Sequence, residues 1–145
     1  MSSPLEGFPL LSEISAEERT ALEGFLESRE FDAGSVLFHS GEEADSMIFA
    51  ISGAVQIKTD GQNVAELGPG EVLGALSLVS IGRRECEAVC ATPTQVMSLT
   101  REGYLRLRDD FPGLALRLQE AVVRSFAQLV RGVVGDSRAP STALS

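Results

Sequence analysis

The chain has 145 residues, a formal net charge of −9 at pH 7 and a hydrophobic content of 43%. This length fits one domain that buries a substantial core. No apolar run reaches the roughly eighteen residues of a membrane span, and no basic-then-apolar leader precedes the domain, so we expect a cytoplasmic protein. The strong acidic excess makes nucleic acid a poor partner.

The acidic excess lies in the N-terminal part of the chain. Residues 1–57 hold eleven acidic and two basic residues, whereas residues 58–145 hold ten of each, so the first part carries the whole difference of nine. Two interpretations stay open: a solvated acidic face that keeps the protein soluble, or a docking site for a basic partner.

A helix is predicted to open the domain after an N-terminal segment of residues 1–14. Ser15 and Glu18 have the spacing of a capping box, in which the serine caps the helix and the glutamate returns a hydrogen bond. Apolar residues then recur at helical spacing at Ala21, Leu22, Phe25 and Leu26. The pattern predicts a helix that ends near Ser28.

Short apolar runs separated by glycines follow this helix. Such a pattern is typical of a roll of short antiparallel strands. The dipeptide Asp60-Gly61 between two of these runs indicates a tight hairpin. We predict strands at about 35–39, 46–51, 54–59, 63–67, 86–91 and 95–99.

Two helices are predicted to close the domain. Thr100 is placed to cap a short helix over 101–109, and Pro112 suits the first turn of a last helix over about 112–134, where its missing N–H does no harm. Residues 136–145 are small and polar, which predicts a disordered tail.

The last helix is apolar over an unusually wide arc. At 100° per residue its polar side chains fall within about 80°, and its apolar side chains span about 200°, although one contact surface needs only about 100°. We favour a homodimer through residues 116–134; the alternative is a helix sunk against the roll and covered by the N-terminal helix. The candidate dimer residues are Leu116, Val123, Phe126, Val130 and Val133.

The most informative stretch runs from Gly68 to Arg84. Glycines stand at positions 68, 70 and 74, and Gly74 and Arg84 are ten residues apart. A resemblance to a known family implies that this stretch is an anion site, in which a tight glycine turn lets the backbone approach the ligand, a short helix that opens near Ala75 directs N–H groups at it, and one arginine closes the site.

This stretch resembles the phosphate-binding cassette of the cyclic-nucleotide-binding domain family, which includes cyclic AMP receptor proteins and protein kinase A regulatory subunits. The resemblance extends over residues 31–56, where Gly34, Gly41, Gly53 and the pair Ala44-Asp45 fall at the family's positions. It implies a mainly β fold for residues 15–135: an antiparallel β-roll (a double-stranded β-helix or jelly roll) with an N-terminal helix and a long C-terminal helix.

The cassette departs from the family pattern at five positions. Ala75 replaces the glutamate that accepts a hydrogen bond from the ribose, and Glu87 replaces the threonine that donates to the cyclic phosphate. Ser77, Arg83 and Cys86 replace an alanine, a proline and a second alanine. The candidate altered ligand site therefore comprises Gly74, Ala75, Leu76, Ser77, Arg83, Arg84, Cys86 and Glu87.

These departures predict weak nucleotide binding. Loss of a hydrogen bond like the one Ala75 cannot accept costs about 1.5–3 kcal/mol. A carboxylate at Glu87 repels a phosphate by up to about 4 kcal/mol. Alternatively, it forms an internal ion pair with Arg84 in the place that a ligand phosphate would occupy. An ordinary surface arginine at position 84, paired with Glu85 or Glu87, is the alternative interpretation.

No enzyme chemistry is indicated by the sequence. His39 is the single histidine, which argues against a metal site, and no nucleophile–base pair is evident. Cys86 and Cys90 lie four residues apart in a predicted strand, about 13 Å between Cα atoms, which is too far for a disulfide. We interpret both as small core residues.

We therefore predict a non-catalytic bacterial regulatory or adaptor module whose usual cAMP or cGMP site is degraded, and which acts through dimerisation or an unidentified protein partner. The alternative is a working sensor of a cyclic nucleotide or cyclic dinucleotide. Many bacterial relatives in this family continue into a DNA-binding winged helix-turn-helix; we expect none in this chain, and we expect no cofactor.

Overall fold

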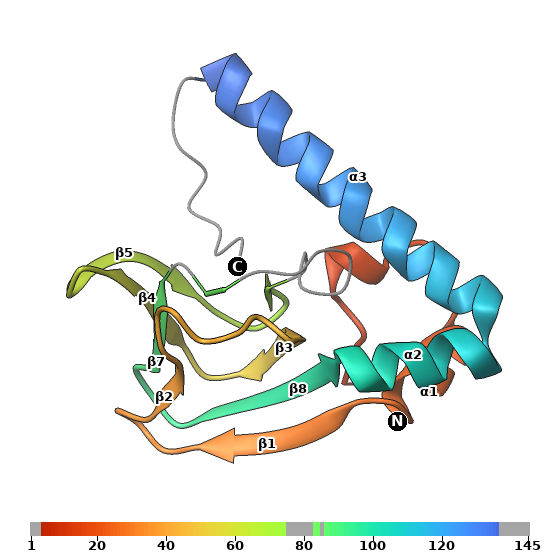
Figure 1. Cartoon of the computed structure of the whole chain (residues 1–145), viewed down its shortest axis with the longest axis horizontal. Coiled ribbons are helices and arrows are strands. Elements are labelled where there is room, and N and C mark those ends of the chain that lie inside the picture. The colour runs from red at the N-terminus through yellow and green to blue at the C-terminus, as the bar shows by residue number, and fades with distance from the viewer. Residues whose placement is uncertain (1–3, 75–82, 85, 137–145) are drawn as a thin grey trace.

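Two four-stranded antiparallel sheets and four helical segments make up the computed structural model, which describes residues 4–74, 83–84 and 86–136, with side chains up to residue 125 (Figure 1). One sheet has the order β1 (Glu27–Phe31), β8 (Thr94–Thr100), β3 (Ser46–Ser52) and β6 (Val72–Leu73). The other has the order β2 (Val36–Phe38), β7 (Glu87–Cys90), β4 (Val55–Thr59) and β5 (Gln62–Leu67). The helical segments are η1 (Pro9–Leu11), α1 (Ala16–Glu23), α2 (Arg101–Asp110) and α3 (Pro112–Asp136).

This architecture confirms the predicted mainly β roll with flanking helices. All six predicted strands are present, and the Asp60-Gly61 turn joins β4 to β5. Both turn residues have positive φ, 52° and 80°, as the tight hairpin requires. Among the described helices, none is long and apolar enough to cross a membrane.

Side-chain alternation along the strands gives the first sheet two buried faces. Met47 and Phe49 of β3 face the helices, whereas Ile48 between them faces the interior of the roll. In β8, Leu99 likewise joins the helical side and Val96 the roll. The period of two along each strand therefore builds two cores, one beneath the helices and one between the sheets.

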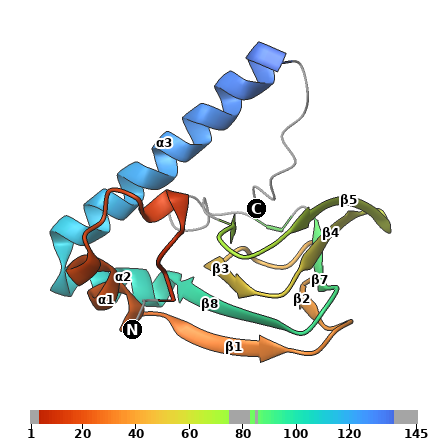
Figure 2. The same cartoon turned by 180° about the vertical axis from the view of Figure 1, so that it is seen from behind.

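The N-terminal segment belongs to the helical core. Leu5, Phe8, Leu11 and Ile14 are all at most 4% exposed, and the Phe8 ring packs edge-on against Phe49 with centroids 5.4 Å apart. The sequence analysis set residues 1–14 apart from the domain. The structure differs, because the apolar residues of this segment complete the surface beneath α3 (Figure 2).

The first helix begins as predicted and ends earlier. The Ser15 Oγ accepts from the Glu18 N–H, and the Glu18 carboxylate accepts from the Ser15 N–H, each at 3.1 Å. Helix α1 stops at Glu23, so the predicted end near Ser28 is wrong. Residues 27–31 instead form β1, which pairs with β8 along its whole length. This sequence is polar and exposed, so ladder pairing decides its conformation.

The two C-terminal helices follow the prediction closely. The Thr100 Oγ1 accepts from the Gly103 N–H at 3.0 Å, and α3 begins at Pro112. Ion pairs join Arg117 of α3 to Glu18, and Arg124 to Glu13. These surface pairs link α3 to α1 and to the segment that precedes it. Apart from Asp136, which ends α3, the predicted disordered tail lies outside the described residues.

Helix α3 buries one apolar face and exposes another. Leu114, Leu118 and Val122 are at most 2% exposed, whereas Leu116 and Val123 are 57% and 56% exposed. The alternative of a helix whose whole apolar arc is covered is therefore wrong at Leu116 and Val123, and the homodimer stays a prediction. The side chains of Phe126, Val130 and Val133 lie outside the description.

Truncation of Leu11 tests whether the N-terminal segment is part of the core. Leu11→Ala should lower the free energy of unfolding by about 2–5 kcal/mol, because it leaves a cavity beneath α3. Leu105→Ala is the matched control, since Leu105 is 41% exposed, and it should change stability by only about 0.5 kcal/mol. Chemical denaturation measures both. An equally small effect of Leu11→Ala would show that this segment does not pack on the domain.

Candidate functional site

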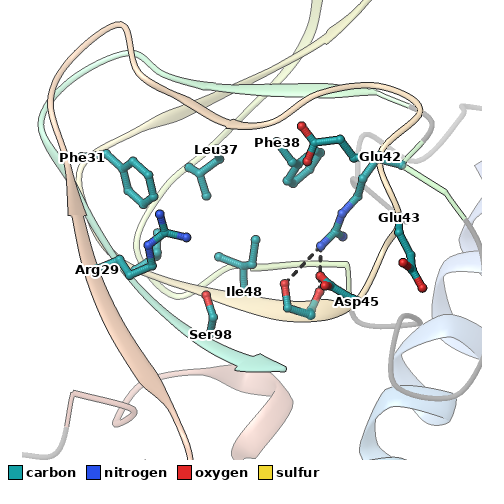
Figure 3. Close-up of a pocket in the computed structure, with 12 residues that line it drawn as sticks. Arg29, Phe31, Leu37, Phe38, Glu42, Glu43, Asp45, Ile48 and Ser98 are labelled. Carbon is teal, nitrogen blue, oxygen red and sulfur yellow. Dashed lines mark hydrogen bonds between the residues drawn. The ribbon is translucent and has the colours of Figure 1, made fainter. Parts of the chain in front are cut away.

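The guanidinium group of Arg84 is buried at the centre of the candidate site. Only 3% of the residue is exposed. Its Nη2 donates to the Ser46 carbonyl oxygen at 2.9 Å and to the Ser46 Oγ at 3.3 Å (Figure 3). Its Cζ lies 4.4 Å from the centroid of the Phe38 ring, a cation–π distance. The alternative of an ordinary surface arginine at this position is therefore wrong.

Backbone pairing with residues 41–43 fixes Arg84 in this position. The Arg84 N–H donates to the Glu42 carbonyl at 2.7 Å, and the Gly41 N–H donates to the Arg84 carbonyl at 2.8 Å. Glu43 and Arg83 form the neighbouring bridge. Successive side chains point to opposite sides of extended backbone, so Arg83 is exposed and donates to the Gly41 carbonyl at 2.8 Å while Arg84 points inward.

Gly74 is required by the position of the arginine. A Cβ at residue 74 would lie 2.2 Å from the Arg84 Nη1, and the backbone there has a φ of +67°. Both the contact and the left-handed conformation exclude ordinary side chains. The predicted pairing of glycine turn and arginine is thus a direct contact between Gly74 and Arg84.

The second terminal nitrogen of Arg84, Nη1, is buried and makes no hydrogen bond to any residue that the structure describes. Burial lowers the pKa of Arg84 from its ordinary value, and the charges of Asp45, Cys86 and Glu42 oppose part of that shift. The group stays cationic at neutral pH because a guanidinium is not deprotonated in proteins. A buried unpaired N–H of a cation favours an anionic acceptor beside Gly74.

A cavity of about 170 Å³ extends from Arg84 into the roll. Residues of β1, β2, β3 and β8 line it together with Glu42, Glu43 and Asp45. Arg29 and Phe31 lie at one end, and Glu42 and Asp45 lie at the other (Figure 3). Of the predicted cassette residues that the structure describes, only Arg84 lines this cavity.

Glu87 does not occupy the place that the sequence analysis expected. It lies directly opposite Lys58 in the β4–β7 ladder, while the next pair, Ala88 and Ile57, is buried in the roll. Cross-strand partners share a face, so Glu87 points away from the roll interior. The carboxylates that act on Arg84 are those of Asp45 and Glu42. The expected internal Glu87–Arg84 pair is therefore not formed.

The remaining predicted site residues divide into two groups. Cys86 is 7% exposed and packs in the roll core, which agrees with its interpretation as a core residue, and Cys90 is also buried. Ala75, Leu76 and Ser77 lie outside the described residues. In the part of the chain that the structure covers, no three potential metal ligands gather.

Sequence reasoning did not identify the residues that hold Arg84. Ser46 supplies mainly a backbone carbonyl oxygen, which no side-chain pattern reveals. Phe38 supplies a ring face to the arginine. Strand periodicity could not assign Phe38 to this face, because the β2–β7 register shifts between Val36 and Phe38.

Comparison with known proteins agrees with this geometry. A family model described as the cyclic nucleotide-binding domain matches residues 28–111. The cyclic AMP receptor protein of Thermus thermophilus is 30% identical over 125 residues, which cover 83% of this chain and 58% of that protein. The chain also spans only 26% of a cAMP-dependent protein kinase regulatory subunit from Hypocrea atroviridis. It therefore spans less than two thirds of the length of these curated relatives.

Solved structures share the fold over most of the chain. The N-terminal domain of a transcriptional regulator from Streptomyces coelicolor A3(2) superimposes with a TM-score of 0.78 at 24% identity, covering 96% of this chain and 99% of that one. The regulatory subunit of a cAMP-independent protein kinase A from Trypanosoma brucei gives a TM-score of 0.70 at 22% identity, covering 83% and 42%. Together with the family match over residues 28–111, the buried arginine and its glycine turn place this chain in the cyclic nucleotide-binding domain family.

Proposed function

We propose that this chain is a non-catalytic regulatory or adaptor module in which the ordinary cyclic nucleotide site is degraded and the output passes through self-association. The observation that carries the proposal is that groups of the protein itself already interact with the Arg84 guanidinium. Its Nη2 is bound internally by Ser46, and the carboxylates of Asp45 and Glu42 act on its charge. An incoming phosphate must compete with these groups for the same guanidinium.

The sequence of the cassette supports weak binding for a second reason. Alanine at position 75 has no carboxylate to accept a hydrogen bond from a ribose hydroxyl, which is the role that the family resemblance gives to glutamate there. Loss of such a bond to a charged group weakens binding by about 1.5–3 kcal/mol, or roughly ten- to a hundredfold. The fold itself does not decide the matter, because a protein kinase A regulatory subunit described as cAMP-independent shares it.

The exposed face of α3 supports self-association as the output. Leu116 and Val123 are seven residues apart, so they lie on nearly the same side of the helix, and both are more than half exposed. Val130 follows after another seven residues in the sequence. Apolar residues repeated every seven positions form one of the two rows of a coiled-coil seam. A second copy of α3 is the partner that presents a matching seam.

A working sensor is the second candidate function, and one observation favours it. The Arg84 Nη1 is buried beside Gly74 and has no partner within the described residues. Glu87 points away from this position, so the like-charge repulsion expected from the sequence is absent there. A cyclic nucleotide or cyclic dinucleotide with enough other contacts would then gain a buried charge-assisted hydrogen bond.

Titration calorimetry separates the two candidates. Under the degraded-site proposal, cyclic AMP and cyclic GMP bind with dissociation constants no tighter than the high-micromolar range, because the ribose acceptor is missing and Arg84 is internally engaged. The sensor function instead requires saturable binding at micromolar or lower concentration by cyclic AMP, cyclic GMP or a cyclic dinucleotide. Sub-micromolar binding of either mononucleotide would refute the degraded-site proposal.

Self-association is tested by light scattering. The wild-type chain should have about twice its monomer mass of 15.4 kDa, and Val123→Glu should reduce the mass to that of a monomer by placing a charge in the seam. Val64→Glu on β5 is the matched control, because Val64 is also 56% exposed, and this variant should remain a dimer. A wild-type protein that is monomeric at high micromolar concentration would contradict the proposed output.

Repair of the cassette tests which position limits nucleotide binding. Ala75→Glu should strengthen cyclic nucleotide binding by about ten- to a hundredfold, because it restores the ribose acceptor. Glu87→Thr alone should change affinity by less than about twofold, since this side chain faces away from Arg84.

Arg84→Ala in the Ala75→Glu background should abolish the gain, whereas Arg83→Ala should preserve most of it, because Arg83 is exposed and contacts Gly41. The proposal fails if Glu87→Thr recovers binding by itself, or if the gain survives the loss of Arg84.

A further inference from the structure

An open groove of about 420 Å³ lies where α1 meets the corner between α2 and α3. These three helices gather at one end of the molecule (Figures 1 and 2). None of the described residues that line the groove lines the cavity beside Arg84. Apolar atoms make up most of its exposed surface. Its volume falls within the range of about 300–1,000 Å³ that is typical of binding sites, so a large side chain of a partner fits into it.

Helix geometry brings the lining residues of each wall together. On α1, Glu17 and Ala21 are four residues apart and therefore share one face of the helix. On α3, Leu114 and Arg117 are three residues apart and do the same. The ion pair between Glu18 and Arg117 joins the two walls. The groove is thus built from neighbouring faces of two helices.

Phe111 supplies an aromatic ring to this groove. The residue is 45% exposed, and its ring makes a T-shaped contact with Phe25, with centroids 5.9 Å apart. This contact limits the motion of the ring, so less conformational entropy is lost when a partner packs against it. Aromatic rings are frequent anchors of protein interfaces, and they attract the cationic groups of lysine and arginine.

The groove carries a negative charge. Glu17, Glu18 and Asp110 contribute three negative charges and Arg117 one positive charge, a net of −2. The ion pair with Glu18 neutralises Arg117. Glu17 and Asp110 have no ion pair with any residue that the structure describes. Two carboxylates are therefore left to bind the basic side chains of a partner.

The start of α3 favours a peptide over a small cation as the occupant. The first-turn N–H groups of Gly113 and Leu114 have no acceptor within α3, and Phe111 before them has no side-chain oxygen that could cap the helix. Both residues line the groove. The backbone carbonyl groups of a bound peptide are acceptors for such donors, and a metal ion or a polyamine has none.

We propose that this groove docks a basic segment of a partner protein. An apolar or aromatic side chain of that segment packs on Phe111 and Ala21, and flanking lysine or arginine side chains bind Glu17 and Asp110. Glu17 also belongs to the acidic excess of residues 1–57, for which a docking site for a basic partner was one of the two open interpretations. The proposal goes beyond the proposed function, because it needs neither a nucleotide nor a second copy of the chain.

Amide-detected NMR of the full chain tests the groove with three synthetic peptides. The first has one phenylalanine flanked on each side by two arginines, the second has alanine in place of that phenylalanine, and the third has aspartates in place of the arginines. The first should give saturable shifts at Ala21 and Phe111 with a Kd below about 1 mM. The second should bind at least about fivefold more weakly because its anchor is missing, and the third should not bind at these concentrations.

A charge-reversal variant tests the two carboxylates. Glu17→Lys combined with Asp110→Lys should weaken binding of the first peptide at least about tenfold, because two attractive contacts become repulsive. The matched control combines Glu27→Lys on β1 with Glu66→Lys on β5. It changes the net charge by the same amount outside the groove and should weaken binding less than about threefold, because salt screens distant charges.

An alanine variant tests the aromatic anchor. Phe111→Ala should weaken binding of the first peptide at least about fivefold. Leu105→Ala on α2 is the matched control, because Leu105 is 41% exposed and does not line the groove, and it should leave binding unchanged. Thermal unfolding verifies that all of these variants fold.

The proposal is overturned if the first peptide gives no saturable shift, or if the alanine peptide binds equally well, which would indicate general charge attraction only. Equal losses in the two charge-reversal variants would overturn it too. A fall in the light-scattering mass when the first peptide is added would assign the groove to a second copy of the chain instead.

Discussion

Burial of one positive charge sets the main constraint on this domain. A guanidinium inside a roll core is costly unless hydrogen bonds and opposite charges surround it. For Arg84, part of this desolvation cost is offset by the hydrogen bonds to Ser46, by the Phe38 ring and by the carboxylates of Asp45 and Glu42. The contact with Nη1 in turn requires glycine at position 74. A site built around a fixed cation therefore persists even where the cassette sequence has departed from the family pattern.

The loop that surrounds Arg84 also contacts the helical part of the molecule. Arg101, the first residue of α2, donates from its side chain to the Ala44 carbonyl at 3.1 Å and from its backbone to the Asp45 carbonyl at 2.9 Å. Helix α2 leads directly into α3, which carries the exposed apolar face. The loop around Arg84 and the helix proposed to self-associate are thus joined through Arg101 and α2.

The sequence predicted the parts of the fold that depend on local chemistry. The capping box at Ser15, the hairpin at Asp60-Gly61 and the cap at Thr100 form as expected, because each is decided within a few residues. Long-range contacts decided the rest: the polar residues 27–31 become a strand only by pairing with β8. Glu87 was misplaced because the register of β7 against β4, which no motif reveals, sets the face to which it points.

The most direct test of the central claim is the guanidinium NMR spectrum of Arg84 in the ligand-free protein. Hydrogen bonds to Ser46 and the stacking on Phe38 should hinder rotation of the group, giving separate and slowly exchanging Nη1 and Nη2 proton signals. Arg106, exposed on α2, provides the averaged reference spectrum. An Arg84 spectrum as averaged as that of Arg106 would contradict the account, because the arginine would then not be held in place to bind an anion.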